Sequence, residues 1–324
     1  MKALVLKGVG MVETMDLPMP RLEKGQVLVR NRFCAVCNAT DTKMYNGKHA
    51  LVTYPCVFGH EGSGVVEAVG EGVSMVKPGD RVLGAGYPAS PEMASLWGQY
   101  AQYGVAPQEE IIRVPDGVSL EHAALAHMLG EALNAARIAE ITPGENVVIL
   151  GCGAVGLSLL TVLRHFYPAA VVAVDLLEEK LELARRLGAT HTIHSATEDA
   201  AARLQEITGG AGCSVLFEAV GSSKTYAMAY ELLNKRGRLI PFGMIEGTME
   251  LPFRKLYAKR LQMRFVRSAG ENGAENKRLV LEMMRRGLMD VSGLITGRYA
   301  LEDFARAARD IQAGGQIRVL MEIE

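Results

Sequence analysis

The sequence predicts an α/β protein in which a doubly wound, parallel-sheet domain is joined to a mainly antiparallel β domain. Three observations lead to this prediction. Short β-type runs separated by glycine and proline fill residues 1–118, a texture typical of antiparallel sheets. Strands and helices then alternate from residue 146 onward, as in a parallel sheet whose strands are linked by helices. A glycine-rich turn, Gly151-Cys152-Gly153-Ala154-Val155-Gly156, follows the first of those strands.

Length and composition agree with two domains. The chain has 324 residues, of which 49% are hydrophobic and 22% charged, so its apolar side chains are sufficient to fill one large core or two ordinary cores. Lysine and arginine (35) nearly balance aspartate and glutamate (36), which gives a net charge of −1 without a long run of either sign. We therefore expect no nucleic-acid partner and no anionic membrane partner.

Cysteine usage and the first residues bear on localisation. Five cysteines, an odd number without framework spacing, are typical of reduced thiols in a cytoplasmic protein. Met1–Gly8 interrupts its apolar run with Lys7 and predicts an opening strand rather than a signal peptide. The uncharged run Asn146–Leu163 contains three glycines, so it predicts a strand and a helix rather than a membrane span. The expectation is a cytoplasmic protein without a membrane partner.

The first part of the chain contains three clear strand signals between glycines and prolines, at Gln26–Phe33, Gly64–Val69 and Arg81–Leu83. After residue 117 the pattern changes to alanine and leucine. Ser119 is a residue type that favours helix starts, and it opens a predicted helix that runs towards Ile141.

In the second part, helical segments of about 10–15 residues separate the strands. The predicted strands are Asn146–Leu150, Val171–Asp175, Thr190–His194, Ser214–Glu218, Arg238–Phe242 and Met263–Val266. The predicted helices begin near Ala154, span Glu178–Leu187, end near Thr208 and pass through Tyr226–Asn234. The last segment, Gly270–Glu324, predicts two amphipathic helices and a strand over Gln316–Glu322, and it is too short for a core of its own. We therefore expect two domains, residues 1–126 with 269–324, and residues 127–268.

The glycine-rich turn predicts a dinucleotide site. Gly151, Gly153 and Gly156 lie between a strand and a helix, where glycine permits a tight turn and close approach of the backbone to a pyrophosphate. Ala154 and Val155 belong to the same turn. The next strand ends in Asp175, 19 positions after Gly156, and a carboxylate there accepts both ribose hydroxyls and repels a 2′-phosphate. The predicted cofactor is NAD.

Two motifs in the first domain carry a family resemblance. They are Cys34-Ala-Val-Cys37-Asn-Ala-Thr40-Asp41 and Gly59-His60-Glu61-Gly62-Ser63-Gly64. Together with the glycine turn, the Lys77–Val82 and Trp97–Tyr103 segments and Leu301-Glu-Asp303, they resemble the zinc-containing medium-chain alcohol and polyol dehydrogenase family. The resemblance extends over nearly the whole chain and implies a Rossmann cofactor domain and a GroES-like catalytic domain.

The same resemblance implies a catalytic zinc, which needs about three protein ligands and an open position. Cys37 and His60 would be two of them. The family places the third about sixteen residues before a Pro-Gly pair, which in this sequence is His127. Glu131, one helical turn later, is a rival ligand, and Glu61 is a further alternative. No cysteine lies between Gly84 and Trp97, where relatives insert a structural zinc lobe, so we expect one zinc per chain and no structural zinc.

By resemblance, Thr40 would accept a hydrogen bond from the substrate hydroxyl and start a proton relay. Asp41 would orient a ligand, and Glu61 would do likewise or exchange with water at the metal. Two features depart from the family pattern. One extra residue separates Cys37 from Thr40, and Lys43 stands where some relatives carry a relay histidine.

The leading hypothesis is therefore an NAD-dependent zinc oxidoreductase acting on a secondary alcohol, polyol or sugar-like substrate, with a ketone or aldehyde product. Two alternatives stay open. One is a zinc-free NAD(P)H-dependent reductase on the same scaffold, and the other is a nicotinamide-binding sensor without turnover. The family resemblance also implies a homodimer or homotetramer.

Overall fold

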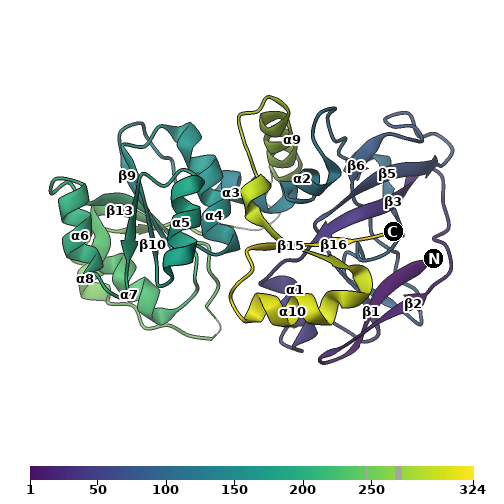
Figure 1. Ribbon diagram of the computed structural model, residues 1–324, viewed down its shortest axis with the longest axis horizontal. Helices are drawn as coiled ribbons and strands as arrows, with labels where there is room; N and C mark the ends of the chain where they lie inside the picture. Colours follow the sequence, from purple (N-terminus) through teal and green to yellow (C-terminus); the bar gives the residue numbers. More distant parts are fainter. Residues whose placement is uncertain (246, 267–271) are drawn as a thin grey trace. The chain divides into compact units, whose positions relative to one another are not determined.

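The computed structural model describes residues 1–245, 247–266 and 272–324, and two compact units can be distinguished in it (Figure 1). The first unit comprises Met1–His127 and Lys277–Glu324, and the second comprises Met128–Asn276. The domain boundary expected between residues 268 and 269 lies outside the described residues.

The first unit is built on two mainly antiparallel sheets, as predicted. One sheet has the order β2-β1-β4-β7 and consists of β1 (Lys2–Gly8), β2 (Met11–Asp16), β4 (Cys56–Val57) and β7 (Ala94–Ser95). The other has the order β15-β16-β3-β5-β6 with β8 also paired to β3, and consists of β3 (Gln26–Ala35), β5 (Gly62–Val69), β6 (Arg81–Leu83), β8 (Tyr103–Pro107), β15 (Ile295–Ala300) and β16 (Arg318–Glu322). Among these pairings β4–β7 and β15–β16 are parallel.

Strand β16, near the end of the chain, pairs antiparallel with β3 from its first part. Leu320 lies opposite Ala35, and Glu322 lies opposite Phe33. Residues 318–321 are all buried, so this strand is covered on both faces. Phe58, Tyr100 and Phe304 pack edge to face beside it, with ring centres 4.9–5.5 Å apart. This aromatic core fixes the strand ends that carry the candidate site.

The helices of the first unit are short. They are α1 (Thr40–Tyr45), η1 (Gln108–Glu110), α2 (Leu120–Ala124), η3 (Ser292–Leu294), η4 (Leu301–Asp303) and α10 (Phe304–Gln312), while α3 (Ala126–Ile138) and α9 (Gly273–Arg285) cross the unit boundary. Ser119 caps α2 by accepting the His122 N–H (3.1 Å). The single helix predicted up to Ile141 is wrong at Leu125, where ψ is close to zero and the N–H bonds to His122, three residues back.

The second unit contains a six-stranded, all-parallel sheet, as predicted. Its order is β11-β10-β9-β12-β13-β14, formed by β9 (Asn146–Leu150), β10 (Ala170–Asp175), β11 (His191–His194), β12 (Cys213–Glu218), β13 (Leu233–Pro241) and β14 (Gln262–Met263). From β9 the chain adds β10 and β11 on one side, and then adds β12, β13 and β14 on the other side, so the direction of strand addition reverses between β9 and β12. Dinucleotides bind at such a reversal, outside the carboxyl ends of the strands.

Helices pack around this sheet (Figure 1). They are α4 (Ala154–Leu163), η2 (Arg164–Phe166), α5 (Glu178–Arg186), α6 (Ala200–Ile207), α7 (Ser223–Leu232) and α8 (Phe253–Lys259). Helix α5 lies on β10 and β11, and α7 lies on β12. None of the helices in the described residues combines the length and apolar composition needed to cross a bilayer.

Two sequence predictions in this unit need correction. The helix expected through Asn234 ends at Leu232, because Leu233 is extended and already pairs with Cys213 in the sheet. The strand expected over Met263–Val266 is confined to Gln262–Met263, the two residues that pair with β13. Helix α8 and strand β15 were not predicted.

Candidate metal and cofactor sites

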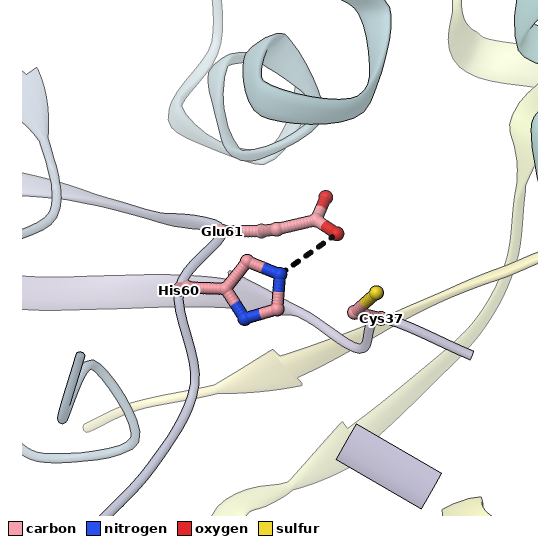
Figure 2. A group of neighbouring side chains, drawn as sticks. All are labelled: Cys37, His60 and Glu61. Atoms are coloured by element: carbon pink, nitrogen blue, oxygen red, sulfur yellow. Dashed lines mark ion pairs between the residues drawn. The ribbon is translucent and has the colours of Figure 1, made fainter. Parts of the chain in front are cut away.

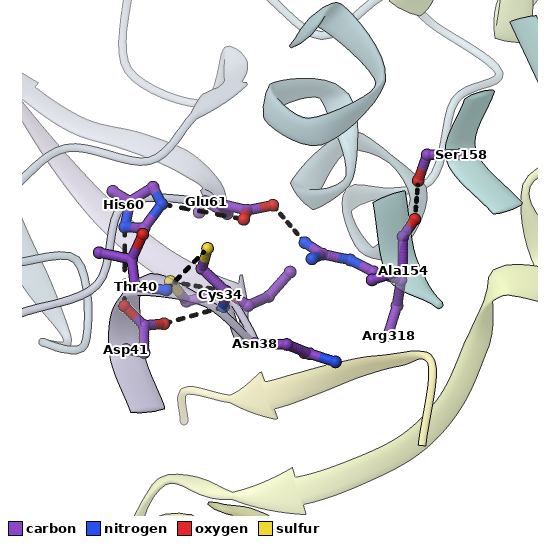
Figure 3. Close-up of polar contacts among 12 residues, drawn as sticks. Cys34, Asn38, Thr40, Asp41, His60, Glu61, Ala154, Ser158 and Arg318 are labelled. Carbon is purple, nitrogen blue, oxygen red and sulfur yellow. Dashed lines mark hydrogen bonds and ion pairs between the residues drawn. The ribbon is translucent and has the colours of Figure 1, made fainter. Parts of the chain in front are cut away.

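Cys37 lies in the turn between β3 and α1. Its N–H donates to Asp41 Oδ2 (2.9 Å), and the Asp41 N–H donates to the Cys37 carbonyl (2.9 Å). The Thr40 N–H is directed at Cys37 Sγ (3.5 Å). These contacts form a closed turn that accommodates the extra residue before Thr40, and Figure 3 shows Asp41 of this turn facing His60.

His60 is placed by the glycine that precedes it. Gly59 has φ +93°, and a Cβ there would lie 2.6 Å from the Tyr100 ring, so only glycine allows the chain this close to the aromatic core. His60 Nδ1 lies 3.7 Å from Asp41 Oδ1, and Nε2 lies 3.8 Å from Glu61 Oε1 (Figure 2). The ring is therefore flanked by a carboxylate on each nitrogen.

Glu61 is fully buried and is held by Arg318, whose Nη2 donates to Glu61 Oε2. Arg318 is itself 1% exposed and comes from β16, 257 positions away. Sequence reasoning missed this partner. The available signal was an arginine inside the apolar run Ile317–Met321, because a buried arginine requires a paired carboxylate.

Cys37, His60 and Glu61 converge. One donor atom from each lies within 4.8 Å of the others (Figure 2). Glu61 Oε1 is buried without a hydrogen-bond partner, and so are His60 Nδ1 and, beside the cluster, Asp41 Oδ1, which lie 3.7 Å from each other. Buried polar atoms are normally satisfied, and thiolate, imidazole and carboxylate are the donors that Zn²⁺ uses. The residues present therefore fit a zinc ion.

His127, at the start of α3, lies next to this cluster but outside the three-donor group. Its ring centre is 5.1 Å from that of His60, at an interplanar angle of 80°. Two imidazoles on one tetrahedral zinc, each with a Zn–N bond of about 2 Å, have ring centres about 5 Å apart. Glu131, the rival ligand, belongs to the second unit.

The electrostatics of the cluster favour a positive charge. Burial lowers the pKa of His60, but contact with Cys37 and the carboxylates of Asp41 and Glu61 outweigh it and raise the pKa to about 9. Burial raises the pKa of Glu61, yet Arg318 and the two histidines bring it below its usual value. Burial lowers the pKa of His127 to about 4, so its imidazole is neutral at neutral pH, the form that binds metals.

Trp97 covers one side of His60, with ring centres 4.7 Å apart. It is 47% exposed and has φ +63°, a left-handed conformation that is uncommon for a bulky residue. Sequence reasoning named the segment but did not identify this contact. No local pattern signals it, because tryptophan is disfavoured in that conformation.

The glycine turn has the geometry expected at a dinucleotide site. Gly151 has φ +97°, and a Cβ at Gly156 would lie 1.9 Å from the Gly151 carbonyl oxygen, so both glycines are needed for helix α4 to approach the strand. Gly153 caps α4 without a side-chain hydrogen bond, and Ala154 begins the helix, with its carbonyl accepting from Ser158 Oγ (2.7 Å). The N–H groups of that first turn are suited to bind phosphate oxygens.

Asp175 ends β10 beside this turn. Its Oδ2 accepts the Cys152 N–H (2.7 Å), and its Oδ1 accepts the N–H groups of Leu176 and Leu177 (2.8 and 3.0 Å). The structure therefore brings Asp175 to the glycine turn.

A second carboxylate organises the neighbouring strand end. Glu218, fully buried at the end of β12, accepts from Val220 N–H (3.1 Å), Gly221 N–H (3.0 Å) and Thr225 Oγ1 (2.7 Å). A Cβ at Gly151 would lie 2.5 Å from the Val220 side chain. Glu218 thus fixes the loop that packs directly against the glycine turn, and sequence reasoning assigned it no role.

Comparison with known proteins identifies the families of both domains. Residues 23–116 match the alcohol dehydrogenase GroES-like domain, and residues 154–285 match the zinc-binding dehydrogenase family. The probable D-xylulose reductase A of Aspergillus terreus is 30% identical over 98% of this chain and 97% of its own length. The L-threonine 3-dehydrogenase of Anaeromyxobacter dehalogenans is 28% identical over 95% and 94%.

Solved structures give the same result. The alcohol dehydrogenase of Thermus sp. ATN1 is 26% identical, with a TM-score of 0.88 over 100% of both chains. The 2R,3R-butanediol dehydrogenase of Bacillus subtilis is 25% identical, with a TM-score of 0.88 over 100% of this chain and 99% of that one. With both domain families matched and a relative similar along nearly its whole length, this chain belongs to the zinc-binding, medium-chain alcohol and polyol dehydrogenase family.

Proposed function

We propose that this protein is a zinc-dependent oxidoreductase that transfers a hydride between NAD and a secondary alcohol, polyol or sugar-like substrate. The convergence of Cys37, His60 and Glu61 donors in a buried, hydrogen-bond-deficient cluster carries the proposal. A thiol, an imidazole and a carboxylate gathered in this way are the donor types that Zn²⁺ uses. The names of the xylulose reductase and butanediol dehydrogenase relatives support the substrate class.

We assign Cys37, His60 and His127 as the metal ligands, with Glu61 as the residue that exchanges with water. When bound, zinc supplies Lewis-acid chemistry that lowers the pKa of a substrate hydroxyl. Arg318 holds one oxygen of Glu61 and leaves Oε1 towards His60, which suits an alternating role. Asp41, 3.7 Å from His60 Nδ1, orients the imidazole so that the other nitrogen faces the cluster.

Proton transfer is assigned to Thr40. It begins α1, is half-buried and is positioned by its backbone contact with Cys37 Sγ. Its hydroxyl oxygen accepts the hydrogen bond, and then the proton, of the substrate hydroxyl while it releases its own proton. We assign Lys43, one turn further along α1 and partly exposed, as the group that passes that proton to solvent.

The cofactor is NAD, bound by the turn from Gly151 to Gly156 with Asp175 on the ribose. Three N–H groups already orient the Asp175 carboxylate, and the following residues, Leu176 and Leu177, provide no positive charge for a 2′-phosphate. We further propose one zinc per chain without a structural zinc, a cytoplasmic location, and a homodimer or homotetramer.

The test is zinc per chain by elemental analysis, with NADH affinity measured in parallel. Wild type is expected to hold about one zinc, and Cys37→Ala and His127→Ala to lose it, while all three bind NADH equally. Glu61→Gln separates the ligand assignments, because retained zinc in His127→Ala with loss in Glu61→Gln would make Glu61 the third ligand. Metal-free wild type that resists reloading would contradict the proposal and favour the zinc-free reductase or the non-catalytic sensor.

A further inference from the structure

Trp97 is locked in an unfavourable backbone conformation by its neighbours. The Tyr87 N–H donates to the Gly98 carbonyl (2.9 Å), and Ser95 Oγ donates to the Tyr87 carbonyl (2.5 Å). A Cβ at Gly86 would lie 1.9 Å from the Trp97 carbonyl oxygen, so the glycine is needed for this packing. Strained residues that the surrounding structure over-determines are concentrated at functional sites.

The strain places the indole beside the metal cluster. The ring lies 4.7 Å from the His60 ring, at an interplanar angle of 51°, and 6.4 Å from the His49 ring, at 77°. About half of the residue remains exposed. The indole therefore presents part of its aromatic face next to a proposed zinc ligand.

We infer that Trp97 is a specificity-determining residue, which forms one wall of the substrate site and selects alcohols with a flat, C–H-rich face, such as cyclic alcohols and sugar rings. The inference rests on the proposed function. Apolar C–H groups stack on an aromatic face, and a small linear alcohol has too little surface to use it.

The first experiment exploits the composition, because Trp97 is the only tryptophan of the chain. Its emission is recorded while cyclohexanol or ethanol is added to the zinc-loaded protein without NAD. We expect a saturable change with cyclohexanol and only the linear solvent effect with ethanol, as measured on free N-acetyltryptophanamide. Equal responses to the two alcohols would overturn the inference without any reference to turnover.

The second experiment compares kcat/KM for cyclohexanol and ethanol in wild type, Trp97→Phe and Trp97→Ala. The ratio of the two values is expected to fall about 10-fold or more in Trp97→Ala, within the range that an apolar contact supplies, and to be largely retained in Trp97→Phe. An equal fold-change in kcat/KM for both alcohols would overturn the inference, and so would the same cyclohexanol-to-ethanol ratio in Trp97→Phe and Trp97→Ala. Wild type without activity on any alcohol would instead overturn the proposed function.

A glycine variant and a matched control separate the effect of backbone strain at Trp97 from the effect of its proposed substrate contact. Trp97→Gly is expected to unfold at a higher temperature than Trp97→Ala, since glycine adopts this conformation freely, although both lose the substrate preference. Tyr167, in the second unit, is another exposed aromatic with a left-handed backbone (φ +53°). Tyr167→Gly and Tyr167→Ala should show the same order of stability with an unchanged alcohol ratio, and a changed ratio there would overturn the assignment to Trp97.

Discussion

Replacing Arg318 by methionine tests whether the buried pair with Glu61 holds the first unit together. The two side chains are 1% and 0% exposed, and Arg318 Nε and Nη1 have no other hydrogen-bond partner. Methionine keeps most of the side-chain volume and removes the charge. The Glu61 carboxylate is then left buried beside Asp41 without the cation that lowers its pKa.

The expected loss of stability follows from the burial of both side chains. Removing one partner of a fully buried ion pair costs about 3–5 kcal/mol, because the other charge stays desolvated. A unit of this size loses about 2–4 °C of Tm for each kcal/mol. We therefore expect the first unit of Arg318→Met to unfold about 6–20 °C below wild type.

The assay is thermal unfolding by circular dichroism in EDTA, so that metal binding does not add stability. The double variant Arg318→Met/Glu61→Gln removes both charges and should recover about 2–3 kcal/mol relative to the sum of the single variants. An Arg318→Met Tm within about 2 °C of wild type, or strict additivity in the double variant, would refute this account of the pair.

Three further predictions concern the second unit. Glu218→Gln replaces a carboxylate that accepts three hydrogen bonds by an amide that can accept on one atom only, and it should weaken NADH binding about 10-fold or more. Glu145→Gln breaks the ion pair with Arg238, away from the strand end that carries Glu218, and should leave the NADH Kd unchanged. Equal NADH Kd values for the two variants would show that Glu218 does not position the loop. Gly156→Ala should abolish NADH binding, because its Cβ would meet the Gly151 carbonyl oxygen at 1.9 Å, and an unaltered fluorescence titration would contradict this. Burial raises the pKa of Glu145, but Arg238 and the Thr142 N–H outweigh it and lower the pKa below 4.5, so the pair stabilises the fold above that pH and the contribution is lost as pH falls further. The free energies of urea unfolding of wild type and Arg238→Met should differ at neutral pH and converge as the pH is lowered below 4.5, and a constant difference would disprove the linkage.

The cofactor unit was predictable because its signals are local. Each strand is a continuous apolar run, and Gly151, Gly153, Gly156 and Asp175 are placed by the turn that follows their own strand. Spacing along the sequence therefore determines spacing in space. The errors fall at Leu125, Leu233 and β14, where sheet pairing or a single ψ angle ends an element that propensity alone would continue.

The metal cluster was only partly predictable, because its members come from different strands. Motifs identified Cys37, His60 and Glu61, but no spacing rule connects Glu61 to Arg318 across 257 positions. The conformation of Trp97 opposes its own backbone preference, and it arises from packing against Gly86 and Gly98. Long-range pairing and stored strain are properties of the folded chain, so they leave no local pattern.

The extra residue before Thr40 shows how a departure from a motif is absorbed by local geometry. With Asn38 and Ala39 between Cys37 and Thr40, the bond from the Asp41 N–H to the Cys37 carbonyl spans one full helical turn. Asp41 in turn accepts the Cys37 N–H, so the turn is closed at both ends, and it accepts from the Tyr100 hydroxyl (2.6 Å) of the aromatic core. The added residue therefore lengthens the turn without releasing Cys37, since Asp41 anchors both the cysteine and the start of α1 to the same core that positions His60.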